Sequence, residues 1–277
     1  MSSATSASEF AREVSRPDSE IDLARAALVI ARGEYPDLDV GAYLDRLDAL
    51  ARRAISGRSG GDLLGQLHRV RECLFEEEGF AGNTADYSDP RNSYLSDVID
   101  RRLGIPITLS LVLIDVGRRV GLEMEGIGLP GHFVTGARVG GEHLLLDPFN
   151  GGAILTGEGC SDVVARALGR RIELTAEHFR PVSHRQFLTR LLSNLKASYW
   201  RLEAWGKVVD MIDRLMTLNP RAGGEWRDRG FAWTKQGEIR RGIADWERYL
   251  TDFPKAPDRE EVRSELRRAR HNLARLN

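Results

Sequence analysis

The sequence predicts an α+β domain followed by an all-α repeat region. Three observations support this: segments with helical apolar spacing, two short strands joined by Gly140-Gly141, and a 34-residue periodicity near the end of the chain. Apolar residues recur every three to four positions in a helix and alternate faces in a strand. Because helices come before the strands, we expect a small antiparallel sheet packed on helices over 19–182, then repeats over 186–277.

The composition is that of a soluble globular protein. The chain has 277 residues, of which 42% are hydrophobic and 29% charged, and its net charge is -1. Such a balance gives no field that would attract nucleic acid or an anionic membrane. No apolar run approaches the ~18 residues that span a bilayer, and residues 1–5 do not begin a secretory signal. Two cysteines in a chain this long favour a reducing compartment. We expect a cytoplasmic protein of unknown oligomeric state.

Helices are expected in the first part of the chain. Residues 1–18 are rich in Ser and Ala and are expected to form a disordered tail. Helical spacing then predicts three helices, over 20–33, 39–55 and 61–77. The pairs Gly82-Asn83 and Asp89-Pro90 mark a loop.

A strongly apolar helix is predicted over 107–120. Pro106 fits its first turn, where the missing N–H of proline is not needed, and Gly121 fits its end. Residues 122–129 are expected to be a strand that leads into a hairpin.

The hairpin places His132 beside Asp147. Its two-residue Gly140-Gly141 loop is typical of a tight turn, and the resulting register sets Val134 opposite Asp147. Paired residues share a face, so His132 and Asp147 become diagonal neighbours within side-chain reach. A carboxylate beside an imidazole sets its tautomer and favours its charged form. The pair is a candidate general base with its orienting group, or else a structural pair.

The region 186–277 carries a 34-residue repeat. Leu195, Tyr199, Val208, Ile212 and Pro220 recur 34 positions later as Arg229, Trp233, Gly242, Trp246 and Pro254. This spacing resembles tetratricopeptide repeats. Two copies are too few to be stable alone, so we expect a capping helix over 257–275. The expected partner of these repeats is a protein or peptide. An exposed tryptophan in this region would mark the groove that binds the partner, whereas a buried tryptophan would belong to the core of the repeats.

Four linked motifs resemble those of SirB-type proteins. They are Asn92-Ser93-Tyr94-Leu95, residues 101–109, Leu129-Pro130-Gly131-His132-Phe133 and residues 147–152. The resemblance implies a transglutaminase-like, papain-like core followed by tetratricopeptide repeats. It also implies that His132 and Asp147 match the His and Asp of a Cys-His-Asp triad. The motif residues expected around the cleft are Asn92, Pro106, Pro130, Gly131, Pro148 and Asn150.

The resemblance places the thiol of that triad at the start of the buried helix, within 106–108, where this sequence has no cysteine. A thiolate at a helix N-terminus beside an imidazolium is the nucleophile of such a site. Thr108 and Ser110 are alternative hydroxyl nucleophiles. The alternative, which we favour for both residues, is that Thr108 caps or back-bonds the first turn and Ser110 packs inward. Cys73 on a helix and Cys160 on a loop are weaker thiol candidates.

No cofactor or metal ion is expected. His143 shares a face with Asp147, but the two are roughly 13 Å apart along one strand, too far for one ion to bind both. Gly126-Ile127-Gly128 leads into a proline and not into a helix, so it is not a phosphate loop.

Two functions therefore compete. The missing thiol favours a non-catalytic or cryptic transglutaminase-like protein that acts as an interaction or regulatory module. The retention of both His132 and Asp147 favours an acyl-transfer or hydrolase enzyme. In that enzyme His132 is the general base, Asp147 orients it, and Thr108, Ser110 or a remote thiol is the nucleophile.

Overall fold

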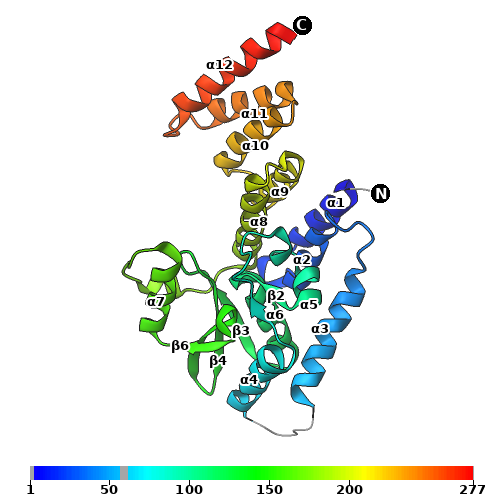
Figure 1. Cartoon of the computed structure of the whole chain (residues 1–277), viewed down its shortest axis with the longest axis vertical. Coiled ribbons are helices and arrows are strands. Elements are labelled where there is room, and N and C mark those ends of the chain that lie inside the picture. The colour runs from blue at the N-terminus through cyan, green and yellow to red at the C-terminus, as the bar shows by residue number, and fades with distance from the viewer. Residues whose placement is uncertain (1–2, 57–61, 277) are drawn as a thin grey trace. The chain divides into compact units, whose positions relative to one another are not determined.

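The computed structural model describes residues 3–56 and 62–276 (Figure 1). Some predicted segments extend outside these ranges. These are the tail at positions 1 and 2, the third helix at position 61 and the repeats at position 277. The chain forms two compact units, Met1–Leu191 and Leu192–Asn277. The division falls within helix α8 (His184–Arg201), a few residues after the predicted boundary.

The elements of the first unit come in the order helices, sheet, helix. Its helices are α1 (Ser3–Val14), α2 (Leu23–Ala31), α3 (Val40–Ile55), α4 (Leu63–Arg71), α5 (Leu95–Arg101), α6 (Pro106–Arg119) and α7 (Gly157–Leu168). Its strands are β1 (Ala81–Gly82), β2 (Leu103–Gly104), β3 (Glu123–Ile127), β4 (Val134–Val139), β5 (Glu142–Asp147) and β6 (Ala153–Leu155). Short helical turns include Glu72–Glu77, which continues α4, and Pro148–Asn150 (η4).

Ser3–Val14 form helix α1, so the prediction of a disordered tail over 1–18 is wrong for this part of it. Phe10 and Val14 lie one turn apart on α1 and are buried. The hydroxyl of Ser6 also donates to the carbonyl of Val29 on α2, at 2.9 Å. The apolar stripe of this helix is short and lies among Ser and Ala residues, so the composition of the segment does not indicate a helix.

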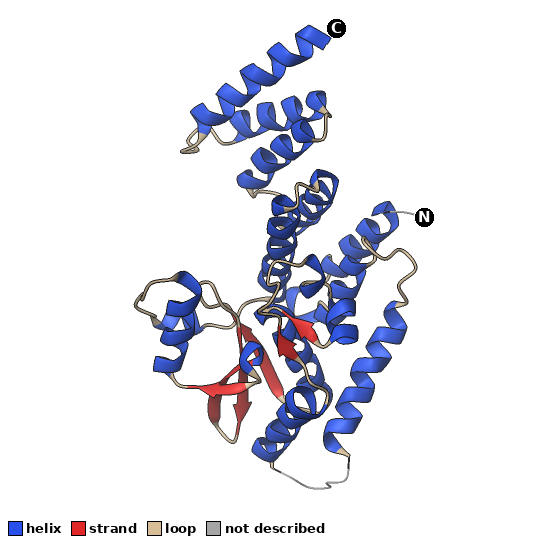
Figure 2. Cartoon of the chain, viewed as in Figure 1, coloured by secondary structure: helices blue, strands red, loops and turns tan. Residues whose placement is uncertain are grey.

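The main sheet has four antiparallel strands in the order β3-β4-β5-β6 (Figure 2). Gly140 and Gly141 form the tight turn between β4 and β5 with φ of +58° and +86°, values that glycine adopts without strain. Val139 pairs with Glu142 and Thr135 with Leu146, which confirms the predicted register. Strands β1 and β2 form a separate parallel pair.

Helices cover both faces of the main sheet (Figure 1). Residues 106–114 of α6 are all buried, and this helix packs on β3 and β4. On the other face, α7 brings Val163 and Val164 against Ile127 and Val134. The predicted architecture, a helical domain with a small antiparallel sheet, is therefore confirmed.

The second unit confirms the predicted repeat. Helices α9 (Trp205–Leu218), α10 (Gly223–Lys235), α11 (Ile239–Asp252) and α12 (Arg259–Leu276) follow α8. Helix α11 begins and ends 34 residues after α9. Trp246 is 3% exposed and packs with Val262 and Leu266 of α12, which caps the array. The other four tryptophans are partly buried, so none forms the exposed groove marker considered above.

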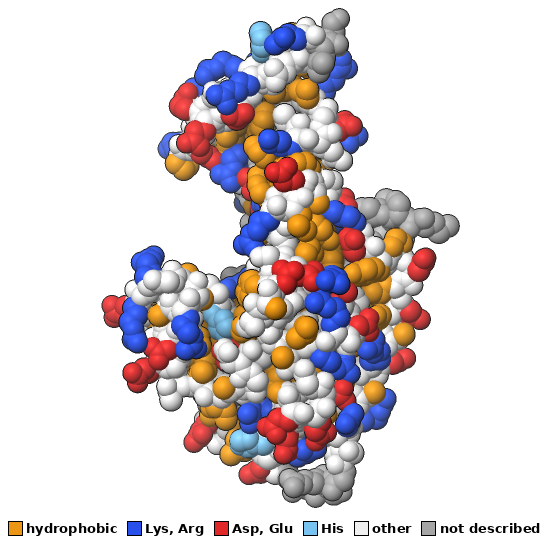
Figure 3. Space-filling model, in the orientation of Figure 1, with side chains coloured by type: hydrophobic (Ala, Val, Ile, Leu, Met, Phe, Trp, Pro, Cys, Tyr) orange, Lys and Arg blue, Asp and Glu red, His pale blue; other side chains and the backbone are white. Residues whose placement is uncertain are grey.

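Basic and acidic side chains are interspersed on the face drawn in Figure 3, in keeping with the net charge of -1. None of the described helices combines the length and the apolar character needed to cross a lipid bilayer.

Candidate functional site

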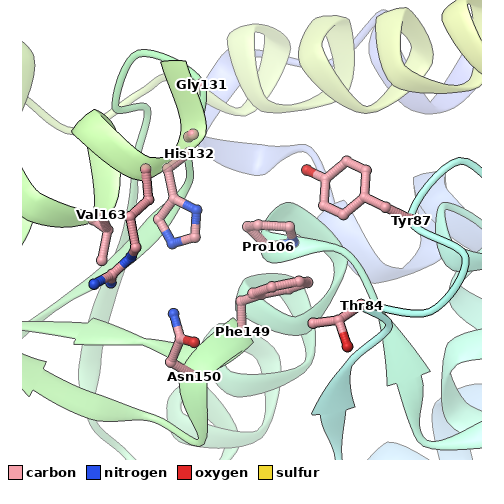
Figure 4. Close-up of a pocket in the computed structure, with 10 residues that line it drawn as sticks. Thr84, Tyr87, Pro106, Gly131, His132, Phe149, Asn150 and Val163 are labelled. Atoms are coloured by element: carbon pink, nitrogen blue, oxygen red, sulfur yellow. The ribbon is translucent and has the colours of Figure 1, made fainter. Parts of the chain in front are cut away.

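A pocket of about 430 Å³ lies in the first unit, where the start of α6, the turn before β4, η4 and α7 meet. Its size falls within the range of small-ligand sites. It is lined by Thr84, Tyr87, Pro106, Gly131, His132, Phe149, Asn150, Val163, Arg166 and Ala167 (Figure 4).

His132 and Asp147 are in direct contact, as the hairpin register predicted. Nε2 of His132 lies 3.0 Å from Oδ1 of Asp147. The carboxylate is fully buried, whereas the imidazole is 7% exposed and its ring points into the pocket (Figure 4). Because Nε2 faces Asp147, Nδ1 is the ring nitrogen left for a ligand.

Asp147 is held as a carboxylate. Its Oδ2 accepts a hydrogen bond from Nδ2 of Asn150 at 2.7 Å, and its Oδ1 accepts one from the N–H of Phe149 at 3.1 Å. Burial acts to raise the pKa of Asp147, but the His132 contact and these two donors outweigh it, so the pKa lies below its ordinary value. The negative charge in turn fixes the orientation of the imidazole.

The turn that carries His132 is fixed from two sides. Gly131 has φ of +70°, and a Cβ at this position would lie 2.9 Å from the side chain of Leu168. Arg190 of α8 donates to the carbonyls of Leu129, at 2.9 Å, and His132, at 2.7 Å. Burial lowers the pKa of its guanidinium. Sequence reasoning missed Arg190 because it is 58 residues away from His132 and belongs to no motif.

Pro106 occupies the place near His132 where the triad resemblance expects a thiol. It is the first residue of α6, and its ring lines the pocket together with His132 and Phe149 (Figure 4). The Phe149 ring meets His132 edge-on, with centroids 6.2 Å apart, and meets Tyr87 in the same way at 5.9 Å. The part of the wall formed by Pro106 and Phe149 is therefore apolar.

Neither predicted hydroxyl nucleophile lines the pocket. Thr108 is fully buried, and its hydroxyl accepts from the N–H of Ile105 at 3.1 Å and donates to the carbonyl of Asn92 at 2.7 Å. This is the helix-capping alternative. Ser110 is fully buried within α6 and lies outside the lining residues, as the packing alternative expected.

Asn92 shapes the loop that forms one wall. Its Oδ1 accepts from Nδ2 of Asn83 at 3.0 Å, and its Nδ2 donates to the carbonyl of Asp86 at 2.7 Å. The loop between these residues carries Thr84 and Tyr87 into the lining. Asn92 therefore supports the pocket from outside. Pro130 and Pro148 precede the lining residues Gly131 and Phe149 in the chain and are not themselves lining residues.

Both cysteines are buried away from the pocket. Cys73 lies on the turn Glu72–Glu77, and Cys160 lies on α7, where a loop was expected. Burial raises the pKa of both thiols, to about 11 for Cys160. Neither is a reactive thiolate at neutral pH.

The hairpin face carries no metal cluster. His143 lies near the Gly140-Gly141 end of β5, four residues along the strand from Asp147, and its Nε2 is 2.9 Å from Oε1 of Glu125. Over residues 3–56 and 62–276, no group of three or more His, Cys, Asp or Glu side chains is arranged to hold a metal ion.

Helix α7 supplies lining residues that the sequence did not reveal. Val163, Arg166 and Ala167 belong to it, and the glycines at its start, Gly157 and Gly159, are more typical of a loop than of a helix. The side chain of Thr156 caps this start by accepting from the N–H of Gly159 at 3.1 Å. The sequence does contain one signal of this helix, namely a capping residue, Thr156, followed by an apolar stripe that includes Val163 and Val164.

Comparisons with known proteins agree with this architecture. The profile of the transglutaminase-like superfamily matches residues 39–193, and a tetratricopeptide repeat profile matches residues 195–267. A UPF0162 protein of Xylella fastidiosa is 35% identical over 90% of each chain. One of Vibrio cholerae is 28% identical over 91% of this chain and 94% of its own. Human F-box only protein 21 is 29% identical over 47% of this chain and 21% of its own.

No solved structure gives a significant match to the chain. The profile match covers more than half of the sequence and includes His132, Asp147 and every residue that lines the pocket. The chain therefore belongs to the transglutaminase-like superfamily, and here that domain is followed by tetratricopeptide repeats.

Proposed function

We propose that this protein is a non-catalytic member of its superfamily, in which the pocket binds a ligand without covalent chemistry and the repeats bind a protein partner. A cytoplasmic, regulatory role of the SirB type belongs to this proposal. The observation that carries it is Pro106, which lines the pocket beside His132 where the triad resemblance expects the thiol. A proline ring has no atom that can attack a carbonyl group.

The other candidate nucleophiles support the same conclusion. Cys73 and Cys160 are buried outside the pocket, and their thiol pKa values are raised. The hydroxyl of Thr108 is engaged in capping α6. An acyl-enzyme needs a nucleophile within hydrogen-bond reach of its base, and none of these side chains lines the pocket with His132.

In such a binding site the His132-Asp147 pair is a preorganised polar anchor. Asp147 and its donors hold the imidazole in one orientation, so a ligand meets a fixed hydrogen-bonding group at Nδ1. Preorganisation reduces the cost of ordering on binding. The apolar rings of Pro106 and Phe149 line the pocket beside it, so a ligand that packs on them would displace water from that contact.

Turnover by the purified full-length chain tests this proposal. The protein is incubated with a panel of activated esters, thioesters and amides, and His132→Ala serves as the matched variant. We expect both proteins to match the uncatalysed rate. Turnover that His132→Ala abolishes would overturn the proposal.

The repeats are the expected docking region for the partner. Their helix pairs form a compact unit of their own over Leu192–Asn277, and tetratricopeptide arrays provide extended binding surfaces. Cross-linking of the intact chain in cell extract, followed by mapping of the cross-linked peptides, tests this. Cross-links confined to residues 1–191 would remove the repeats from the proposal.

One observation favours a second candidate, a hydrolase that uses water as its nucleophile. His132 faces an open pocket with Nδ1 available, and Asp147 is placed to stabilise the imidazolium that forms when the ring takes a proton from water. This candidate expects His132-dependent hydrolysis with no covalent adduct. The turnover assay, combined with intact-mass measurement, separates it from both the binding module and an acyl-enzyme.

A further inference from the structure

We infer that the pocket recognises a ligand that carries an oxyanion, a carboxylate or a phosphate, next to a small apolar group. This inference rests on the proposed function, since it names the class of ligand that the pocket binds. Three features carry it: the charge of the lining, the free cation on α7, and the apolar walls beside His132.

The lining is cationic. The described residues that line the pocket include Arg166 and His132 but no Asp or Glu. Arg166 lies in the last turn of α7 and is exposed, and it makes no hydrogen bond or ion pair with any residue over 3–56 and 62–276. Asp162, one turn earlier on α7, is paired with Arg171 at 2.7 Å. The charge of Arg166 is therefore available to a ligand.

A guanidinium has the geometry that an oxyanion requires. Its planar fork of N–H donors matches two oxygens of a carboxylate or phosphate, and such charge-assisted bonds are about twice as strong as neutral ones. His132 presents Nδ1 to the same pocket from another element, because its Nε2 faces Asp147.

The remaining walls define the rest of the ligand. Pro106, Phe149 and Val163 are apolar, and with Tyr87 they surround a volume of about 430 Å³. That volume accommodates one aryl or branched alkyl group beside the oxyanion. A ligand with charge alone would leave these walls in contact with water, and a neutral ligand would leave Arg166 unpaired.

Three small probes test the inference on the full-length chain. Hippurate carries an aryl group and a carboxylate, hippuramide is its neutral amide, and phenyl phosphate replaces the carboxylate by a phosphate. Binding is followed by the NMR shifts of the Val163 methyl groups. Arg166→Gln removes the cation. Arg170→Gln is the matched control, because Arg170 is exposed, has no ion pair with a described residue and lies outside the lining.

We expect hippurate or phenyl phosphate to shift the Val163 resonances, and the tighter of the two identifies the preferred oxyanion. Hippuramide is expected to bind at least about tenfold more weakly, and Arg166→Gln is expected to weaken the anionic probes by about tenfold. Arg170→Gln should leave their affinity unchanged. Equal binding of hippurate and hippuramide, equal effects of the two substitutions, or no shift with any probe would overturn the inference.

The same spectra separate this inference from the proposed function. Hydrolysis of hippurate consumes one water and releases benzoate and glycine, both of which have their own NMR signals. His132-dependent release of these products would refute the non-catalytic proposal but would leave oxyanion recognition intact. If hippuramide binds as tightly as hippurate and no hydrolysis occurs, oxyanion recognition is refuted but the non-catalytic proposal stands.

Discussion

Pro106 and His132 line the same pocket, with the proline at the first position of α6 and the imidazole held from behind by Asp147. The orienting half of a triad is thus complete, while the side chain that faces it has no nucleophilic atom. The helix N-terminus still lies there, and its partial positive charge favours a thiolate or another anion. The site is therefore suited to binding unless a nucleophile is supplied.

Supplying the thiol should create a reactive site. We expect Pro106→Cys to be alkylated by iodoacetamide at pH 7 about tenfold faster than an ordinary exposed cysteine, because the helix N-terminus and His132 lower the pKa of its thiol. The rate is read by intact-mass spectrometry. Adding His132→Ala should lower this rate and leave only the contribution of the helix N-terminus.

Ser110→Cys is the matched control for that experiment. It places a thiol on the same helix at a fully buried position outside the pocket, and we expect no alkylation in the folded protein. Equal alkylation of the two variants, or a Pro106→Cys rate that ignores His132, would show that the two side chains do not form a site.

Asp147→Asn should lower the free energy of unfolding by about 1–3 kcal/mol, because it removes a buried carboxylate that accepts charge-assisted hydrogen bonds. The pKa of Asp147 is lowered in the folded state, so its contribution is present above the unfolded value of about 4 and is lost as pH falls through the folded value. Urea unfolding at neutral and acidic pH measures both. If acidification lowers the free energy of unfolding as steeply in Asp147→Asn as in the parent protein, this role of Asp147 is refuted.

Arg190 should stabilise the turn that carries His132. We expect Arg190→Met, which keeps the apolar stem, to cost about 2–3 kcal/mol, because the carbonyls of Leu129 and His132 lose a charged donor. Arg180→Gln is the control. Its side chain is 71% exposed and, among the described residues, pairs only with Glu177, so we expect a change below about 0.5 kcal/mol in the same unfolding measurement. Similar costs for the two substitutions would refute the role of Arg190.

Gly230 allows the close packing of the second repeat. A Cβ at Gly230 would lie 2.5 Å from the indole of Trp246, so Gly230→Ala should destabilise the repeat unit by about 1–3 kcal/mol. Gly224→Ala, on the same helix, meets only the far end of Arg227 at 3.9 Å and should be neutral or stabilising. Thermal unfolding followed by tryptophan fluorescence distinguishes them. A stable Gly230→Ala protein would mean that α10 and α11 pack less closely.

The parts of the fold predicted from sequence were those fixed by local rules. The glycine pair set the turn and therefore the register that brings His132 to Asp147, and the 34-residue period set the helix lengths of the repeats. The pocket walls depend on distant packing. Arg190 and Arg166 reach the site from α8 and α7, and neither local periodicity nor spacing indicates that approach.

The helix over Ser3–Val14 also depends on contacts between distant residues, which the sequence does not reveal. Its Ser- and Ala-rich sequence has little apolar surface of its own, and it is ordered because Phe10 is buried and Ser6 bonds to Val29. Tertiary contact, which composition does not report, decides whether such a segment folds.

Intact-mass spectrometry with p-nitrophenyl acetate tests whether the pocket holds a nucleophile that His132 activates. The parent chain, His132→Ala and Pro106→Cys are incubated with the ester and weighed. We expect no His132-dependent acetyl group on the parent, because Cys73 and Cys160 are buried and Pro106 has no nucleophilic atom. We expect one acetyl group on Pro106→Cys. A stoichiometric acetyl adduct on the parent that disappears in His132→Ala would contradict it.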